Sequence, residues 1–177
     1  VYKENLYKPM PGYRFIASNT DRSRYYVGEL NGKSSKQAYM DALHISESNI
    51  INQTFHNPIG KMNGQDICII SLKEVSGNGL CCYRQVNDSD VLVLLEEQDY
   101  NEILDETLQR IRRDFNHISG VFSINCVFRY LLFSQEHHME DYLKTMSTLG
   151  DHAGLIGFGE HYNQQFVNQT MTCVVFE

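Results

Sequence analysis

The sequence predicts an α/β (or α+β) fold, in which helices pack on a mixed parallel and antiparallel sheet within a single domain. Three observations lead to this prediction. Residues 91–95 form a continuous apolar run, typical of a strand that is covered on both faces. Residues 100–115 repeat apolar side chains at helical spacing, with charged residues between them. Residues 121–127 are again apolar, so this strand, helix and strand together predict a parallel crossover.

The N-terminal part of the chain predicts a hairpin. Residues 1–12 are rich in proline and are expected to be a linker or entry arm, which leaves residues 13–177 as the domain. Residues 13–18 and 24–30 are short strand candidates on either side of a polar turn at residues 19–21. We therefore expect these two strands to pair.

A helix is predicted after this hairpin. Asn31 and Gly32 form a turn signal that ends the second strand, and Ser34 or Ser35 can cap the helix that follows. Apolar residues fall on one face of that helix. They are Ala38, Tyr39, Ala42 and Leu43. Residues 44–64 contain several turn markers and are expected to be irregular.

The remaining elements alternate between strands and helices. Residues 66–72 and 80–86 predict two strands, with a glycine-rich turn at residues 77–79 between them. Residues 128–150 carry a shorter amphipathic stripe and predict a second crossover. It leads to a strand at residues 153–158, and the short gap before the last strand at residues 169–176 favours antiparallel pairing of these two.

Composition narrows the range of functions. The formal net charge of −7 argues against a nucleic-acid surface, since phosphate contacts need clustered Lys and Arg. The five cysteines are odd in number and lack CxxC spacing, which suits a reducing compartment. No apolar run approaches the ~20 residues of a membrane span. We therefore expect a cytoplasmic protein without membrane contact, and the start at Val1 suggests a piece of a longer chain.

Candidate binding residues gather at the ends of two predicted strands. Asn125 and Arg129 supply hydrogen-bond donors, and Glu160 supplies an acceptor. An Arg can form two parallel hydrogen bonds to a carboxylate, and a Glu can pair with an ammonium group. This set of residues would therefore hold a zwitterion such as an amino acid. An internal Arg129–Glu160 salt bridge explains the same residues equally well. Spacing alone does not decide between these interpretations.

The same residues are compatible with two other chemistries. Cys126, His161 and Glu160 could form a Cys–His–carboxylate set for a hydrolase or transferase, but no nucleophile-elbow signature surrounds the cysteine. A buried and inert Cys126 is the favoured interpretation. His161 could instead be an axial ligand of a haem iron. The residues present no other metal-binding spacing, and no cofactor is expected unless haem is bound.

The chain resembles the FIST C-terminal domain at three short motifs. They are Asn125-Cys126-x-x-Arg129, Gly157-Phe158-Gly159-Glu160 and Asn168-Gln169-Thr170. Residues 29–35 and 58–60 are also similar to that family's opening segment and Pro-x-Gly turn, so the resemblance covers residues 13–177. The chain departs from the family pattern in three respects: the turn before Glu160 is contracted, His161 replaces an aliphatic residue, and the N-terminal FIST half is absent.

This resemblance implies a bacterial signal-transduction sensor rather than an enzyme. The family implies small-molecule ligands, amino acids especially, and some members bind haem and sense nitric oxide. Expected partners are the N-terminal FIST half and a signalling effector domain of the parent protein. We expect seven residues to line the ligand site. They are Asn125, Cys126, Arg129, Gly157, Phe158, Glu160 and Asn168.

Overall fold

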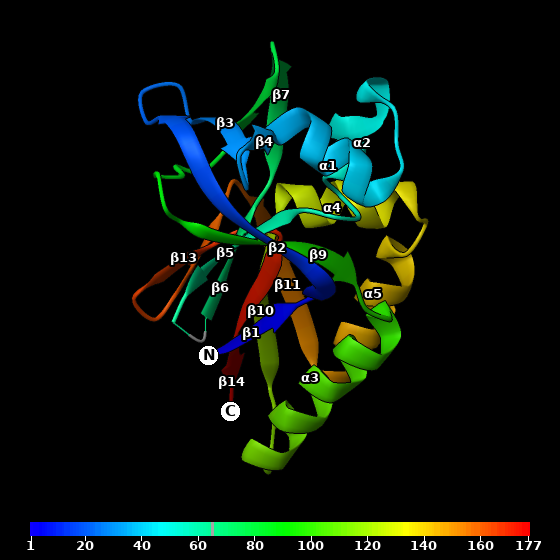
Figure 1. The fold of residues 1–177 in the computed structure, drawn as a ribbon. Coiled ribbons are helices and arrows are strands. Elements are labelled where there is room, and N and C mark those ends of the chain that lie inside the picture. Colours follow the sequence, from blue (N-terminus) through cyan, green and yellow to red (C-terminus); the bar gives the residue numbers. More distant parts are fainter. Residues whose placement is uncertain (65) are drawn as a thin grey trace. The chain divides into compact units, whose positions relative to one another are not determined.

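The computed structural model describes residues 1–64 and 66–177 and confirms the α/β class (Figure 1). The chain forms two compact units, which are described separately. Unit 2 is Lys8–Glu97, and unit 1 combines Val1–Tyr7 with Gln98–Glu177. Over the described residues, no helix combines the length and the apolar character needed to cross a membrane.

Unit 2 is built on an eight-stranded sheet with the order β6-β5-β9-β2-β3-β8-β7, and β4 also pairs with β3. The strands are β2 (Tyr7–Asp21), β3 (Tyr26–Leu30), β4 (Lys33–Ser34), β5 (Ile59–Asn63), β6 (Asp66–Ile70), β7 (Leu72–Ser76), β8 (Gly79–Cys82) and β9 (Val91–Glu97). The helices are α1 (Ser35–Leu43), the short 3₁₀ helix η1 (Glu47–Asn49) and α2 (Ile50–Gln53). Residues 44–64, expected to be irregular, therefore contain η1, α2 and β5.

The predicted hairpin is present in unit 2. β2 and β3 pair antiparallel, and Asp21 opposite Tyr26 is the last pair, so the turn lies later than residues 19–21. Asn31 and Gly32 both have positive φ, at 52° and 74°, which is the geometry of a tight two-residue hairpin turn. Of the two serines considered, Ser34 caps α1, because its hydroxyl accepts a hydrogen bond from the backbone N–H of Gln37.

The apolar run at residues 91–95 forms the buried strand β9, as predicted, but its sheet partners are different from those expected. β9 pairs antiparallel with β5 and lies between β5 and β2 in unit 2, whereas β10 (Gly120–Cys126) belongs to unit 1. The parallel crossover predicted between them is therefore wrong. The reason is that both edges of β9 are already paired within unit 2.

Unit 1 contains a four-stranded sheet with the order β1-β14-β10-β11. Its further strands are β1 (Tyr2–Asn5), β11 (Asp151–Gly157) and β14 (Thr170–Phe176), and β12 (Glu160–Tyr162) and β13 (Gln165–Val167) form a separate hairpin. β10 and β11 are parallel, which confirms the second crossover. β14 pairs with β1 and β10 instead of β11, because β10 occupies the neighbouring edge of β11.

Residues 1–12, expected to be a linker or entry arm, form strands. β1 pairs with β14 from Tyr2 opposite Cys173 to Asn5 opposite Thr170, and β2 begins at Tyr7. The proline-rich composition misled this prediction, since Pro9 and Pro11 lie within β2. β1 is consequently part of the sheet of unit 1, whereas residues 8–12 belong to unit 2.

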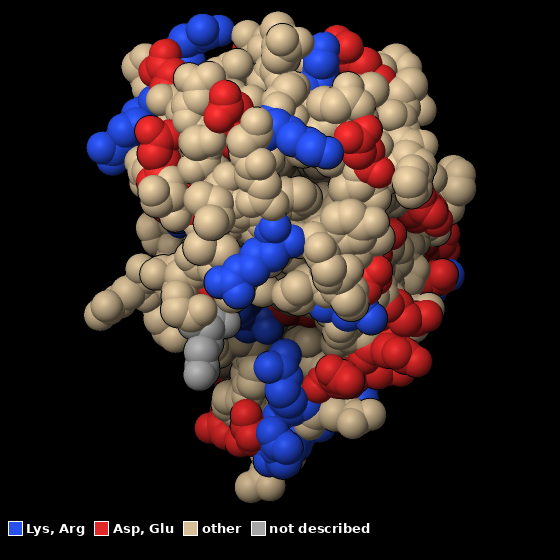
Figure 2. Space-filling model, in the orientation of Figure 1, with Lys and Arg blue, Asp and Glu red and all other residues tan. Residues whose placement is uncertain are grey.

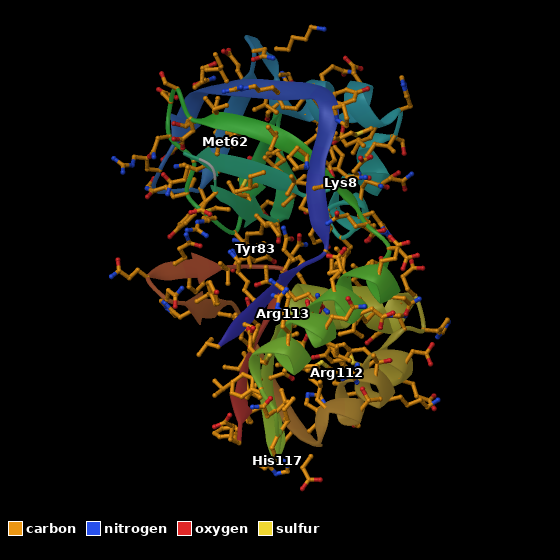
Figure 3. All side chains as sticks on the ribbon, turned by 90° about the horizontal axis from the view of Figure 1, so that it is seen from below. Lys8, Met62, Tyr83, Arg112, Arg113 and His117 are labelled. Carbon is orange, nitrogen blue, oxygen red and sulfur yellow. The ribbon has the colours of Figure 1, made fainter. Side chains whose placement is uncertain are left out.

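The helices of unit 1 are α3 (Tyr100–Asp114), α4 (Val127–Gln135), α5 (Met139–Met146) and the short 3₁₀ helix η2 (Ser147–Leu149). α3 has the predicted apolar stripe, and Asp99 caps it by accepting hydrogen bonds from two backbone N–H groups. Arg112 and Arg113 lie exposed in its last turn, where cations favour the helix dipole (Figure 3). On the face seen in Figure 2, basic side chains are interspersed with acidic ones.

We predict that Leu94→Ala in β9 lowers the free energy of unfolding of unit 2 by about 2–5 kcal/mol, because it leaves a cavity in a closed core. Leu94 is fully buried and pairs with Ile59. Urea unfolding followed by far-UV circular dichroism measures the change. Ile16→Ala is the control, since Ile16 is 56% exposed, and its effect should stay within about 0.5 kcal/mol. Equal effects of the two variants would contradict the assigned core.

Candidate functional site

The candidate site begins where β10 runs directly into α4. Cys126 is the last residue of β10 and the N-cap position of α4, and Arg129 lies in the first turn of the helix. Ser123 and Asn125 alternate with exposed or half-buried residues along β10, so they share its buried face. Strand alternation and the helix start therefore bring Asn125 and Arg129 to one polar region in the interior of unit 1.

Arg129 is buried together with a carboxylate that the sequence analysis did not identify. Its guanidinium forms an ion pair with Glu4 of β1, and both side chains are at most 1% exposed. The guanidinium also lies over two aromatic rings, 4.6 Å from the centroid of Phe133 and 5.5 Å from that of Tyr142. Arg129 Nε and Nη1 and Glu4 Oε2 are buried and have no hydrogen-bond partner among the described atoms. The Arg129–Glu4 ion pair thus uses only part of the hydrogen-bonding capacity of its two side chains.

Glu160 is buried close to this pair but has a different partner. Its Oε2 accepts a hydrogen bond of 2.9 Å from the hydroxyl of Thr170, and its exposure is 2%. Burial raises the pKa of Glu160 to about 7, although the hydrogen bond from Thr170 and the charge of Arg129 act in the opposite direction. The alternative interpretation, an internal Arg129–Glu160 salt bridge, is not observed, since Arg129 pairs with Glu4.

Cys126 is 2% exposed, and burial, together with the nearby charge of Glu160, raises the pKa of its thiol. A raised pKa disfavours the thiolate, which is the nucleophilic form. His161 is exposed on β12, and its ring packs on Phe166 at 5.3 Å between centroids. The structure therefore brings Cys126 and Glu160 together without placing His161 in a buried pocket with them. Over the described residues, no cluster of three metal-binding side chains is present.

The other residues predicted for the site are dispersed. Gly157 pairs with Cys126 at the end of the β10–β11 ladder, whereas Phe158 is 91% exposed. Asn168 is buried, close to Gly159 in the loop before β12. Gly159 has a φ of 131°, and a Cβ there would lie 2.3 Å from the ring of Phe166. This loop therefore requires glycine for steric reasons.

A cavity of about 290 Å³ lies beside β10, β11 and α5 in unit 1. Among the residues predicted for the site, Asn125 lines it. The lining residues are Ser123, Asn125, Tyr130, Met139, Tyr142, Leu143, His152, Ala153, Gly154, Leu155 and Ile156. Arg129 lies behind the wall, against the ring of Tyr142. The cavity thus combines a polar wall with several apolar side chains, as ligand sites commonly do.

A chain of hydrogen bonds runs along the polar wall of the cavity. Asn125 Nδ2 donates to the Tyr142 hydroxyl at 3.0 Å, and that hydroxyl donates to Ser123 Oγ at 3.3 Å. Ser123 Oγ lies 2.9 Å from His152 Nε2. Since Ser123 accepts the proton of Tyr142, its own proton points to Nε2, which requires a neutral His152. Burial lowers the pKa of His152, which favours this neutral form of the ring.

Sequence reasoning missed Ser123, Tyr142 and His152 as site residues. The alternation of β10 was the available signal, because it places Ser123 on the same face as Asn125. Gly154 is opposite Ser123 in the parallel ladder, and a Cβ there would lie 2.6 Å from Ser123 Oγ. A glycine at this position is therefore needed for the hydroxyl of Ser123 to occupy its place in the chain.

Comparison with known families places this site in context. The FIST C domain model matches residues 36–163, which is 128 of the 177 residues. The chain belongs to the FIST C domain family. This family consists of sensory domains of signal-transduction proteins. The matched range includes all of the cavity lining but excludes Glu4 and Thr170. No curated protein and no solved structure matches the chain.

We predict that Glu160→Gln removes a pH-dependent loss of stability. A carboxyl group whose folded pKa is raised stabilises the fold below its unfolded pKa of about 4.3, and this contribution is lost as the pH rises through about 7. Glutamine mimics the protonated form. Below about pH 4 the variant should match the wild type, and at pH 8 it should be more stable by up to about 3 kcal/mol.

Urea unfolding of both proteins across this pH range provides the measurement for Glu160. The exposed Glu106 offers a matched control, because Glu106→Gln should leave the pH dependence of stability unchanged. If Glu160→Gln were less stable than the wild type at pH 8, an ionised Glu160 would be needed by the fold, and its assignment as a protonated group near neutrality would be wrong.

Proposed function

We propose that this FIST C domain is a non-enzymatic ligand-sensing module that binds a small, polar, amino-acid-like molecule in the cavity of unit 1. Binding would be communicated to another domain of the parent protein. The observation that carries this proposal is the amide of Asn125. Its nitrogen is used by Tyr142, whereas its Oδ1 is buried in the cavity wall and has no partner among the described atoms, so a ligand that opens this wall would give the oxygen a hydrogen-bond donor.

The chemistry of the cavity supports a ligand with two kinds of surface. A ligand ammonium group can donate to Asn125 Oδ1, and Ser123 and Tyr142 offer further polar contacts. The apolar part of the ligand would contact the other side of the cavity, where Met139 and Leu143 of α5 lie.

A signal can arise from the apolar side chains that the ligand covers. Leu143, Leu155 and Ile156 line the cavity and are 47%, 49% and 49% exposed, respectively. Covering apolar surface is worth about 25 cal/mol for each Å² removed from water. A ligand held between α5 and β11 therefore favours the conformation in which these elements close on it, and this difference in affinity shifts the equilibrium.

Thermal-shift measurements against amino acids and related metabolites test the proposal. A ligand present at 100 times its Kd should stabilise unit 1 by about 2.7 kcal/mol and raise its Tm by several degrees. Asn125→Leu keeps a similar volume but removes the acceptor, so we expect it to abolish this shift. Asn101→Leu is the control, because Asn101 is exposed in the first turn of α3. The absence of any stabilising compound at millimolar concentration would contradict the proposal.

We also predict that ligand affinity falls at acid pH. His152 has a lowered pKa in the fold, so it is neutral above its unfolded pKa of about 6.5 and accepts the proton of Ser123. Protonation as the pH falls through the lower folded pKa reverses this hydrogen bond and disturbs the wall that holds Asn125. Calorimetric titrations between about pH 5 and pH 8 measure the effect, and Ser123→Ala should flatten the pH profile. A profile that is unchanged in Ser123→Ala would remove the hydrogen-bond chain from the binding mechanism.

A further inference from the structure

β11 lies at an open edge of the sheet of unit 1. Within the described residues it pairs with β10 alone, in parallel register from Asp151 to Gly157, so its other side carries backbone N–H and C=O groups without a neighbouring strand. Five of its seven residues are exposed. An edge of this kind is a template to which another strand can pair.

This edge lacks the features that protect two other edge strands of the protein. β7 has an irregular register between Leu72 and Glu74, and both Lys73 and Glu74 on it are exposed. β1, at the opposite edge of the sheet of unit 1, has only four residues. By contrast, residues 152–157 contain no lysine, arginine, carboxylate or proline, and their register with β10 is unbroken. Short length, charges and bulges are the usual means of blocking strand addition, and β11 uses none of them beyond Asp151.

The sequence of β11 is complementary to a second copy of itself. In an antiparallel pair centred on Gly154, Ala153 lies opposite Leu155 of the second copy, and the reverse holds on the other side, so a small side chain always meets a large one. Asp151 lies opposite Gly157, which keeps the two carboxylates at opposite ends of the pair, whereas a parallel arrangement would place them side by side. We propose that the chain forms a symmetric dimer in which β11 pairs antiparallel with β11 of a second copy.

The same edge bounds the cavity of unit 1. The five consecutive residues His152–Ile156 all line this cavity. Because successive side chains of a strand point to opposite faces, a cavity that all five residues line reaches the backbone at the edge of β11. Ile156 is opposite Asn125 in the β10–β11 ladder, and in the symmetric pair His152 lies opposite Ile156 of the second copy. The second copy therefore adds an apolar side chain beside the cavity. This consequence rests on the proposed function, whereas the pairing of the strands does not.

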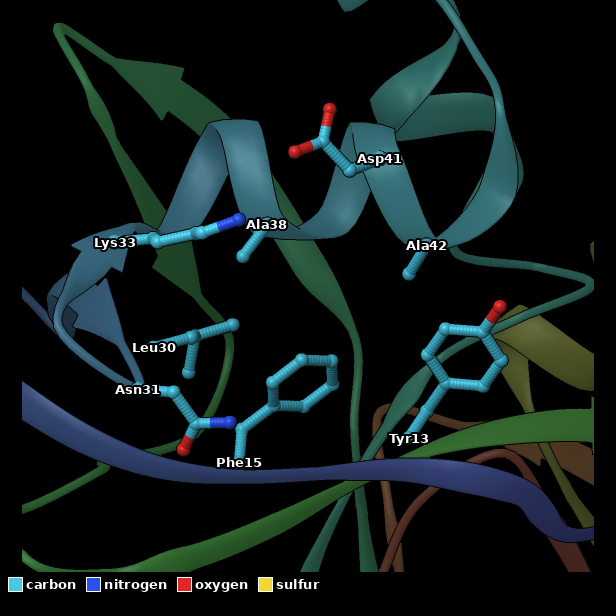
Figure 4. A pocket seen from close by; sticks show the side chains of 8 residues that line it. All are labelled: Tyr13, Phe15, Leu30, Asn31, Lys33, Ala38, Asp41 and Ala42. Carbon is cyan, nitrogen blue, oxygen red and sulfur yellow. The ribbon is translucent and has the colours of Figure 1, made fainter.

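The hollow between α1 and β2 in unit 2 offers no comparable surface (Figure 4). Exposed Lys33 and exposed Asp41 both line it, so its charges select neither an anion nor a cation. The amide of Asn31 is used by the backbone of β2, since it donates to Arg14 O and accepts from Ile16 N. β2 itself lies between β9 and β3, and both of its edges are paired. The open edge of β11 is thus a specific feature of unit 1.

Sedimentation velocity of the full chain without ligand tests the pairing. The wild type should show an equilibrium between monomer and dimer. Leu155→Lys adds a charge of the kind that blocks sheet edges and should weaken dimerisation by about tenfold or more. Val174→Lys is the matched control, because Val174 is 40% exposed on the interior strand β14 of the same sheet, and it should dimerise like the wild type. Far-UV circular dichroism confirms that both variants are folded. A wild type that stays monomeric at about millimolar concentration, or equal effects of the two variants, would overturn the proposal.

An exchange of charges tests the register. Ala153→Lys and Leu155→Glu should each weaken dimerisation. A chain that carries both substitutions places each lysine opposite a glutamate of the second copy, so it should dimerise more tightly than either single variant. A double variant that dimerises no better than the single variants would contradict antiparallel pairing centred on Gly154.

Hydrogen exchange locates the interface and separates it from the ligand site. Amides of β11 should exchange slowly at concentrations at which the dimer forms and faster on dilution, whereas Leu155→Lys should show fast exchange at both concentrations. If the chain dimerises but no amino acid stabilises unit 1, the proposed function fails and the pairing of β11 remains. A monomeric chain that an amino acid stabilises would give the opposite result and would remove the dimer.

Discussion

The burial of Arg129 is the constraint on which the interior of unit 1 depends. A guanidinium inside a protein needs a countercharge, because an unpaired buried charge costs several kcal/mol. Glu4 provides this countercharge from β1, so the first strand of the chain is held against the first turn of α4. The same guanidinium lies over the ring of Tyr142, whose hydroxyl joins Asn125 to Ser123. The ion pair and the wall of the cavity are therefore parts of one polar interior.

Local patterns in the sequence predicted the individual elements well. The helical spacing in α3 and the apolar run of β9 are properties of neighbouring residues, and so are the turn residues of the hairpins. Pairing over long distances was not accessible in this way. Nothing near β9 indicates that its neighbours are β5 and β2, and Glu4 is 125 positions away from Arg129. Such partners are chosen by the packing of the whole unit, which no short window of sequence contains.

In the candidate site, too, some residues were predictable from local sequence patterns and others required the tertiary structure. Asn125 was found because it ends an apolar strand, and it does line the cavity of unit 1. Phe158 was expected on chemical grounds but is almost fully exposed. Ser123 and Tyr142 were missed, since serine and tyrosine are common and become informative only when their hydroxyls meet. Alternation along β10 was an unused signal for the buried face of the strand, whereas the contribution of α5 to the cavity required the tertiary structure.

The chain leaves unit 1 after Tyr7 and returns to it at Gln98, so unit 2 is an insertion in the sequence of unit 1. At the point of departure and return, Gln98 N donates a hydrogen bond of 2.9 Å to Leu6 O. The two ends of the insertion are thus already adjacent. A short glycine linker would therefore join these ends in place of the inserted ninety-residue segment Lys8–Glu97 without stretching the backbone.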